Sequence, residues 1–291
     1  MAQYTIKELE HLSGIKAHTI RIWEQRYNIL CPKRTETNIR YYDDKDLKTL
    51  LNVSLLNEKG FKISKIAQMQ PDQVIEKVQQ LCDVPGECSQ HINNMMSAML
   101  DLDEEAFDKA ISTVTLQVGF AEAMNRLVYP FLHKIGIFWQ TGKITPAHEH
   151  FVSNLIRQKL IVAIDGQVVR RNPESPSYLL YLPEGELHEL ALLYMNYVIR
   201  VKNLHVIYMG QNLPFSDLEL TYALTKPQYI CTVLTSVPDR DQVQKYLDKL
   251  AETFSEATIY IYGMQVQHEH LVFPGNVKRL TCMREFTKLF S

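Results

Sequence analysis

The segment Gly185-Glu186-Leu187-His188 could bind a metal, because it places a carboxylate two residues before an imidazole. A carboxylate at that spacing can hold one ring nitrogen, which fixes the tautomer and makes the other nitrogen a better metal ligand. The segment follows the apolar run Tyr178–Leu182, which we expect to be a buried strand. In doubly wound folds ligands bind at the carboxyl ends of such strands. A solvated loop histidine is the alternative interpretation of His188.

A second group of candidate residues is Trp139, Glu149 and His150. Trp139 ends one predicted helix, and the other two lie in the first turn of the next helix, which we expect to begin at Pro146. A tight turn would bring an indole and two polar side chains to one rim. Two histidine pairs are weaker metal candidates: His148 and His150 would point apart on a helix, and His268 and His270 are expected to be solvated.

The basic residues are concentrated near the start of the chain. Residues 1–70 contain 12 Lys and Arg against 8 Asp and Glu, a net charge of +4, whereas the remainder has −6. A basic head on an acidic body suits binding to nucleic-acid phosphates, with chance asymmetry as the alternative. The candidate groove and phosphate contacts are His18, Thr19, Arg21, Arg26 and Tyr27 on a predicted helix, and Arg34, Arg40 and Tyr41 in a hairpin-like wing.

The head is expected to be a helix-turn-helix. Thr5 and Glu8 have the spacing of a capping box for a helix over residues 6–13, and a second helix is predicted over 17–27. Ile20 and Trp23 lie three residues apart on this second helix and should face inward. A third helix is predicted from Asp43 or Asp44 to residue 59.

In the rest of the chain, the spacing of apolar residues changes once, from a helical pattern to short apolar runs. Apolar residues recur at helical spacing over 92–100, 107–118, 121–139 and 151–164, which predicts a four-helix bundle. Short apolar runs at 178–182, 205–209, 229–234 and 258–262 then alternate with helix-length segments, which predicts a flavodoxin-like (Rossmann-like) parallel sheet. We therefore expect a multidomain α and α/β protein with domains at 1–75, 76–170 and 171–291, and a linker at 170–176.

Composition excludes several classes of protein. The 291 residues are 46% apolar, too many for a disordered chain, and no apolar run reaches the ~18 residues of a spanning helix. Five cysteines without a CxxC pair, and a start without a signal peptide, predict a reduced cytoplasmic protein without a membrane segment. No nucleophile elbow surrounds Ser236 and no glycine-rich phosphate loop follows the first strand, so we expect no enzyme.

The head resembles a known family of regulators. The string YTIKELEHLSGIKAHTIRIWEQRY, followed by RTETNIRYYDDKDLKTLLNVSLLNEKGFKISKIAQM, is similar to the winged-helix head of MerR-family transcription regulators over residues 3–69. The resemblance implies a homo-oligomer that binds a pseudo-palindromic double-stranded DNA operator. It implies that residues His18 to Arg21 read base edges, and that Arg34, Arg40 and Tyr41 contact phosphates.

The body resembles the cobalamin-binding light sensors of the CarH/LitR type, which carry MerR heads. The likeness rests on Trp-x9-Glu-His in the bundle, Glu-x-His after the first strand, and the stretch HVIYMGQNLPFSDL. It implies that His188 is the lower axial ligand of the cobalt of adenosylcobalamin, supported by Glu186. Trp139, Glu149 and His150 would cover the upper face, and light would break the Co–C bond and dissolve a dimer or tetramer bound to DNA.

Four departures from that pattern leave alternatives open. Ala191 replaces the glycine of Glu-x-His-x-x-Gly, and Gly263 is the one glycine left of a Gly-Gly loop that would cradle the nucleotide tail. Val233 stands near the position of a serine, and Gln140 follows the tryptophan where light sensors can carry a histidine. A cofactor-free, degenerate body used for oligomerisation or for a protein partner therefore remains an alternative, and a corrinoid methyl-transfer protein is a second.

Overall fold

The computed structural model describes residues 4–13, 15–34, 38, 40–80, 88–140, 144–168, 172 and 174–290. The chain divides into two compact units, Met1–Val152 and Ser153–Ser291, whose boundary falls within helix α10. Residues 170, 171 and 173 of the predicted linker lie outside the described residues. The division into three domains stays a prediction.

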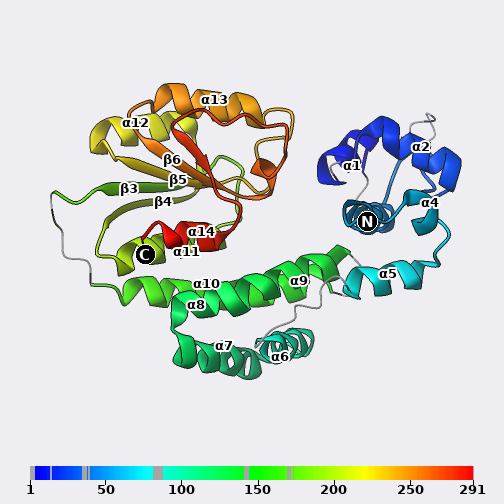
Figure 1. Cartoon of the computed structure of the whole chain (residues 1–291), viewed down its shortest axis with the longest axis horizontal. Coiled ribbons are helices and arrows are strands. Elements are labelled where there is room, and N and C mark those ends of the chain that lie inside the picture. Colours follow the sequence, from blue (N-terminus) through cyan, green and yellow to red (C-terminus); the bar gives the residue numbers. More distant parts are fainter. Residues whose placement is uncertain are drawn as a thin grey trace. The chain divides into compact units, whose positions relative to one another are not determined.

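The first unit begins with the predicted helix-turn-helix and a small wing (Figure 1). Thr5 and Glu8 form the expected capping box: the Thr5 amide donates to the Glu8 carboxylate at 2.6 Å, and the Glu8 amide donates to Thr5 Oγ1 at 3.3 Å. Asp43 Oδ1 accepts from the amides of Lys45 and Asp46 and so starts the third helix. The elements of the head are α1 (Ile6–Ser13), α2 (Ala17–Tyr27), β1 (Lys33–Arg34), β2 (Arg40–Tyr41), α3 (Asp44–Glu58), α4 (Ile63–Ile66) and α5 (Pro71–Gln80).

The hydrophobic core of the head includes one residue from far along the chain. Ile20 and Trp23 of α2 are buried as predicted, together with Leu50 and Leu56 of α3. Ile137, which is 5% exposed, belongs to the same cluster, and its helix α9 packs against α3 and α5. The head therefore depends on a helix of the bundle for part of its core.

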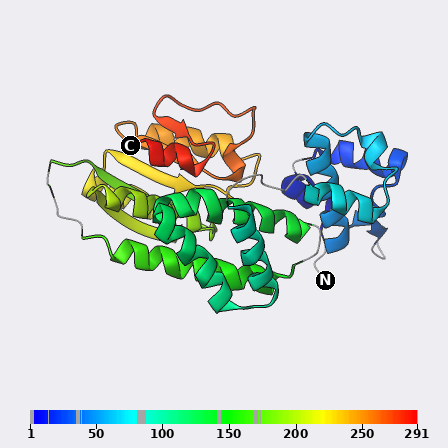
Figure 2. The same cartoon turned by 60° about the horizontal axis from the view of Figure 1, so that its bottom comes forward.

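The helices of the bundle, drawn in green in Figure 2, follow the predicted segments. One predicted helix is interrupted. The stretch predicted as one helix over 121–139 contains a π-helical turn, directly before a helix whose second residue is Pro130. Because proline has no N–H group, it cannot donate to the carbonyl one turn earlier, which favours an altered hydrogen-bond register there. The segments are α6 (Ser89–Leu100), α7 (Glu104–Val118), α8 (Phe120–Ala123), η1 (Met124–Val128), α9 (Tyr129–Gln140) and α10 (Pro146–Asp165).

The second unit contains a five-stranded parallel sheet in the order β4-β3-β5-β6-β7, which is the flavodoxin-like order. Four strands were predicted; the fifth, Val277–Arg279, is three residues long with two exposed basic residues, so its sequence has no apolar run. The strands are β3 (Ser177–Pro183), β4 (His205–Leu213), β5 (Tyr229–Val233), β6 (Thr258–Tyr262) and β7 (Val277–Arg279).

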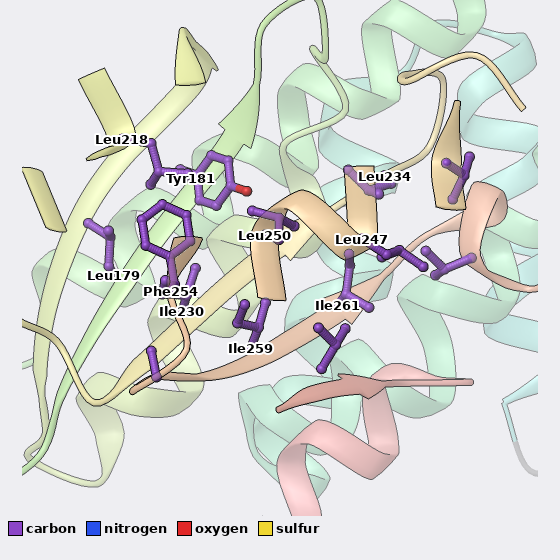
Figure 3. Packing of buried hydrophobic residues seen from close by; sticks show 14 residues of the cluster. Leu179, Tyr181, Leu218, Ile230, Leu234, Leu247, Leu250, Phe254, Ile259 and Ile261 are labelled. Carbon is purple, nitrogen blue, oxygen red and sulfur yellow. The ribbon is translucent and has the colours of Figure 1, made fainter. Parts of the chain in front are cut away.

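Helices cover both faces of this sheet (Figure 1). On one face α12 (Phe215–Thr225) and α13 (Val243–Thr253) enclose a core in which Tyr181 lies near Leu218 and Phe254 (Figure 3). The Tyr181 and Tyr246 hydroxyls lie 2.9 Å apart within it. On the other face lie α11 (Leu190–Val201) and α14 (Met283–Lys288). Among the described helices, none combines the length and the apolar character needed to cross a bilayer.

Candidate functional site

The Glu186–His188 pair lies at the carboxyl end of β3, in the loop that leads into α11. Gly185 opens this loop with a φ of +83°, and its amide donates to Asn212 Oδ1 at 2.8 Å. His188 Nδ1 lies 2.5 Å from Glu186 Oε1. The Glu186 side chain is fully buried, whereas 60% of the His188 side chain is exposed. The predicted pairing of carboxylate and imidazole is therefore present.

Glu186 is held by donors from two loops. Its Oε1 accepts from the amides of Leu187 and His188 at 3.0 and 3.1 Å. Its Oε2 accepts from the amides of Thr235 and Ser236, at 2.8 and 2.7 Å, in the loop after β5. Burial acts to raise the pKa of Glu186, but the hydrogen bonds from His188 and from these amides outweigh it and hold the pKa well below its usual range.

A buried, ionised carboxylate facing Nδ1 determines the protonation of His188. In the neutral ring this places the proton on Nδ1 and the lone pair on Nε2. This tautomer is the one required of an imidazole that binds a metal through Nε2. The donor chemistry of the residues present therefore fits an imidazole ligand of cobalt.

Ser236 is a third member of this site, and it was not predicted from the sequence. Its Oγ donates to Glu186 Oε1 at 3.1 Å, so its hydroxyl supports the carboxylate. In the sequence, Ser236 was examined only as a hydrolytic nucleophile. Its separation of 50 residues from Glu186 gave no sign that the two side chains meet. The adjacency of β3 and β5 in the sheet brings them together, and no local spacing signals it.

Glu189, the residue after His188, makes the other contact that the sequence did not indicate. Its carboxylate, 11% exposed, forms an ion pair with Arg157 of α10, and Arg157 Nε donates the hydrogen bond. Burial raises the pKa of Tyr208, and the nearby Glu189 charge raises it further. The loop that carries His188 is thus fixed to α10 as well as to β5.

Gly263 has a structural use that the sequence interpretation did not foresee. It is buried, with a φ of +123°, and a Cβ there would lie 2.2 Å from the Leu234 carbonyl oxygen. The space that its missing side chain leaves is therefore filled by the chain's own backbone. Val233 is 1% exposed, and Ala191 is half-buried in the first turn of α11. The donor chemistry at the ligand histidine thus fits the cofactor, and the degeneracy of the tail site stays a prediction.

The bundle residues Glu149 and His150 lie in the first turn of α10, which begins at Pro146 as predicted. His150 Nδ1 is 3.2 Å from Glu149 Oε2, and both side chains are more than a third exposed. His148 Nδ1 accepts from the Thr145 amide at 3.1 Å. The backbone of Trp139 and Gln140 is in α9, but their side chains lie outside the described residues. The meeting of this rim with His188 stays a prediction.

The second predicted histidine pair is only partly solvated. The rings of His268 and His270 stack with centroids 5.7 Å apart, and Arg240 Nη2 donates to His268 Nδ1 at 3.1 Å. Burial, with smaller effects of Arg240 and His270, lowers the pKa of His268 to about 4. The expectation of solvation is confirmed for His270, which is exposed, whereas His268 is half-buried beside Arg240. Within the described residues, no three His, Cys, Asp or Glu side chains are grouped as a metal site.

The predicted DNA contacts lie on α2 and in the wing. His18, Arg21 and Arg26 are exposed on α2, while Thr19 and Tyr27 are half-buried. Arg34 is exposed and donates to Asn38 Oδ1 at 2.7 Å. Arg40 and Tyr41 of β2 are half-buried. The buried face of α2 thus leaves its basic face available for a DNA groove.

Comparison with known proteins finds a matching family model for the head and another for the helical bundle. Residues 4–73 match the MerR HTH family regulatory protein model, and residues 91–163 match the B12 binding domain model. The chain is 28% identical to the HTH-type transcriptional repressor CarH of Myxococcus xanthus over 236 residues, covering 78% of this chain and 77% of the relative. It is 23% identical to the repressor CarA of the same organism over 269 residues, covering 91% and 88%.

A solved structure shares the fold of the body. The monomethylamine corrinoid protein of Methanosarcina barkeri superposes with a TM-score of 0.54 at 11% identity, covering 69% of this chain and 97% of that one. At that identity the likeness shows the fold alone. Taken together with the sequence matches, the chain is a transcriptional regulator that joins a MerR-type helix-turn-helix to a B12 binding domain, and it is a homologue of CarH and CarA.

Proposed function

We propose that the chain is a cytoplasmic regulator that binds an operator through its head and cobalamin through its body. The division at residues 1–75, 76–170 and 171–291 assigns one task to each part: DNA reading, cover of the cofactor, and ligation of cobalt. CarH and CarA are both repressors by name, and we propose the same direction of control here, without an enzymatic activity.

The proposal for the head assigns base reading to α2 and phosphate binding to the wing. His18, Thr19 and Arg21 would contact base edges, and Arg26 and Tyr27 would lie against the adjacent backbone. Arg34, Arg40 and Tyr41 would contact phosphates. A helix-turn-helix of this kind reads two half-sites as a dimer, so we propose a homo-oligomer, a dimer or tetramer, on double-stranded DNA.

The proposal for the body rests on one observation: the buried Glu186 carboxylate holds His188 Nδ1 at 2.5 Å. His188 Nε2 would then bind cobalt, with Glu186 and Ser236 orienting the ring. Trp139, Glu149 and His150 would cover the opposite face of the corrin, and Gly263 would border its tail. When bound, adenosylcobalamin would supply a visible chromophore and a cobalt that an imidazole nitrogen can bind.

Cofactor binding is tested by spectroscopy. The purified full chain is mixed with adenosylcobalamin in the dark and desalted, and its visible spectrum is recorded. We expect the wild type to retain corrin absorbance and His188→Ala to lose it. His205→Ala is the matched control, because it removes a part-exposed imidazole at the first residue of β4, at the amino end of the strands, whereas His188 follows their carboxyl end. Equal retention by wild type and His188→Ala would overturn the ligand assignment.

DNA binding is tested independently by gel shift with a duplex that the wild type enriches from a random library. We expect Arg21→Ala or Arg40→Ala to abolish the shift while leaving the melting temperature unchanged. Each phosphate contact adds about one to the steepness of the plot of log binding constant against log salt concentration, so each variant should also show a weaker salt dependence. Arg284→Ala, an exposed arginine on α14, is the control.

The second function is a cofactor-free body that mediates oligomerisation or protein binding, and its support is the sequence departures at Ala191, Val233 and Gln140. The same spectroscopic experiment decides between the two. A desalted wild type without corrin absorbance, combined with normal DNA binding, would support this second function.

A further inference from the structure

A buried pair of polar side chains joins the helix α2 to the wing. Tyr42, which follows β2, has no exposed surface, and Glu24 of α2 is 9% exposed. The Tyr42 hydroxyl donates a hydrogen bond to the Glu24 carboxylate. Buried carboxylates require compensation by hydrogen bonds or charges, so this contact is a specific link between the two elements.

Tyr42 is fixed on both of its sides. Its amide donates to the Tyr4 carbonyl at 2.9 Å, and the Tyr4 amide donates to the Tyr42 carbonyl at 2.8 Å. The next residue, Asp43, accepts the amides that begin α3. The hydroxyl of Tyr42 is therefore a rigid anchor, and Glu24 attaches α2 to it.

Two of the predicted DNA-contacting arginines flank this link. Arg21 lies three residues before Glu24 on α2, and Arg40 lies two residues before Tyr42 on the wing. Burial and Glu24 raise the pKa of Tyr42, whereas Arg40 and Arg21 lower it, so both guanidinium groups act on the hydroxyl. Arg40 Nε is buried and has no hydrogen-bond partner among the described residues.

We propose that Glu24 is a positioning residue for DNA recognition, whose buried carboxylate, anchored by Tyr42, keeps Arg21 on α2 and Arg40 in the wing in a fixed relation. The inference rests on the proposed DNA contacts of the head. A fixed relation between the helix and the wing favours a duplex in which base edges and phosphates are both satisfied. It gives no advantage on a duplex where only phosphates are contacted.

The charge of Glu24 makes the proposal testable, because its two effects have opposite signs. A carboxylate near the DNA repels phosphates, so Glu24→Gln alone should strengthen non-specific binding. If Glu24 positions the arginines, the same variant weakens specific binding. Glutamine has almost the shape of glutamate, so the fold is retained, but its neutral amide oxygen accepts a weaker hydrogen bond from Tyr42 than the carboxylate does. Tyr42→Phe breaks the link without changing any charge.

The experiment measures affinity of the full chain for two probes: the duplex enriched by the wild type and poly(dI-dC). We expect the ratio of the two affinities to fall about tenfold in Glu24→Gln and in Tyr42→Phe. We expect the double variant to be no worse than Tyr42→Phe alone, because Tyr42→Phe already removes the link that Glu24→Gln weakens. Asp72→Asn, an exposed carboxylate of α5, controls for loss of one negative charge.

Each outcome discriminates. A ratio equal to wild type in both variants overturns the inference, and so does an equal change of affinity for both probes, which indicates a purely electrostatic or purely structural role. Additive losses in the double variant also overturn it. A wild-type chain that enriches no duplex contradicts the proposed DNA binding itself, which is a separate failure.

Discussion

Arg157 of α10 pairs with Glu189, the residue that directly follows His188. Because Arg157 is 48% exposed, solvent weakens the pair, but Glu189 is nearly buried and loses its main compensation when Arg157 is removed. We expect Arg157→Met to destabilise the second unit by about 1 kcal/mol. Urea unfolding followed by tyrosine fluorescence measures this. Adding Glu189→Gln should restore most of the loss, since an amide needs no counter-charge; no recovery would contradict the pairing argument.

Glu186 should make stability depend on pH. Its pKa lies below the ordinary 4.5, so the folded protein keeps the charge when the unfolded chain has bound a proton. The stabilisation is fully present above about pH 4.5 and is lost as the pH falls towards the folded pKa. Glu186→Gln should cost about 2 kcal/mol at pH 7 and progressively less below pH 4.5. Unfolding curves across this range test it, with the exposed Glu184→Gln as control. A pH-independent difference would contradict the role of the charge.

Gly263→Ala should be among the most damaging small substitutions in the second unit. The new Cβ would meet the Leu234 backbone at 2.2 to 2.8 Å, and the φ of +123° is strained for any other residue. We expect a loss of about 3 kcal/mol in the free energy of unfolding. Gly275→Ala is the matched control, because a Cβ there meets nothing within 4 Å. Equal effects of the two substitutions would show that the close approach is not limiting.

Ala191→Gly tests whether the methyl group of Ala191 weakens cofactor binding. A glycine at the start of α11 would let a corrin tail pass closer to the backbone, at a cost of up to about 1 kcal/mol in helix stability. We expect the variant to retain more adenosylcobalamin than the wild type after desalting in the dark. Unchanged retention would locate the obstacle elsewhere, at Val233 or beside Gly263.

Ile137→Ala should destabilise the head although it lies in the bundle. Ile137 is 5% exposed within the cluster that contains Ile20 and Leu50. We expect a loss of about 2–4 kcal/mol, visible as faster amide exchange in α3. Val162→Ala, at a position 71% exposed, is the control. Unchanged exchange in α3 would show that α9 does not stabilise the head.

Local patterns predicted much of this fold. The capping box at Thr5, the buried Ile20 and Trp23, and the start of α10 at Pro146 all follow from short-range rules, and the structure confirms them. The short strand β7 carries no apolar run, so period-based prediction missed it. The π-helical turn depends on the bonding of one proline in its context rather than on hydrophobic spacing.

The candidate site was predictable only within its own segment. The Glu186–His188 pair follows from a two-residue spacing. The hydrogen bond from Ser236 and the ion pair with Arg157 connect residues 50 and 32 positions apart, and depend on strand order and helix packing. The role of Gly263 could not be predicted either. A glycine that makes room for a ligand and a glycine that makes room for the protein's own backbone look identical in a sequence.

The contribution of Ile137 to the head has a practical consequence for dissecting the protein. The DNA-binding part is not an independent domain. A fragment that ends after α5 would expose to solvent the apolar surface that Ile137 of α9 covers. A chimera that joins this head to another sensor domain must include α9, or supply another apolar side chain in the position of Ile137.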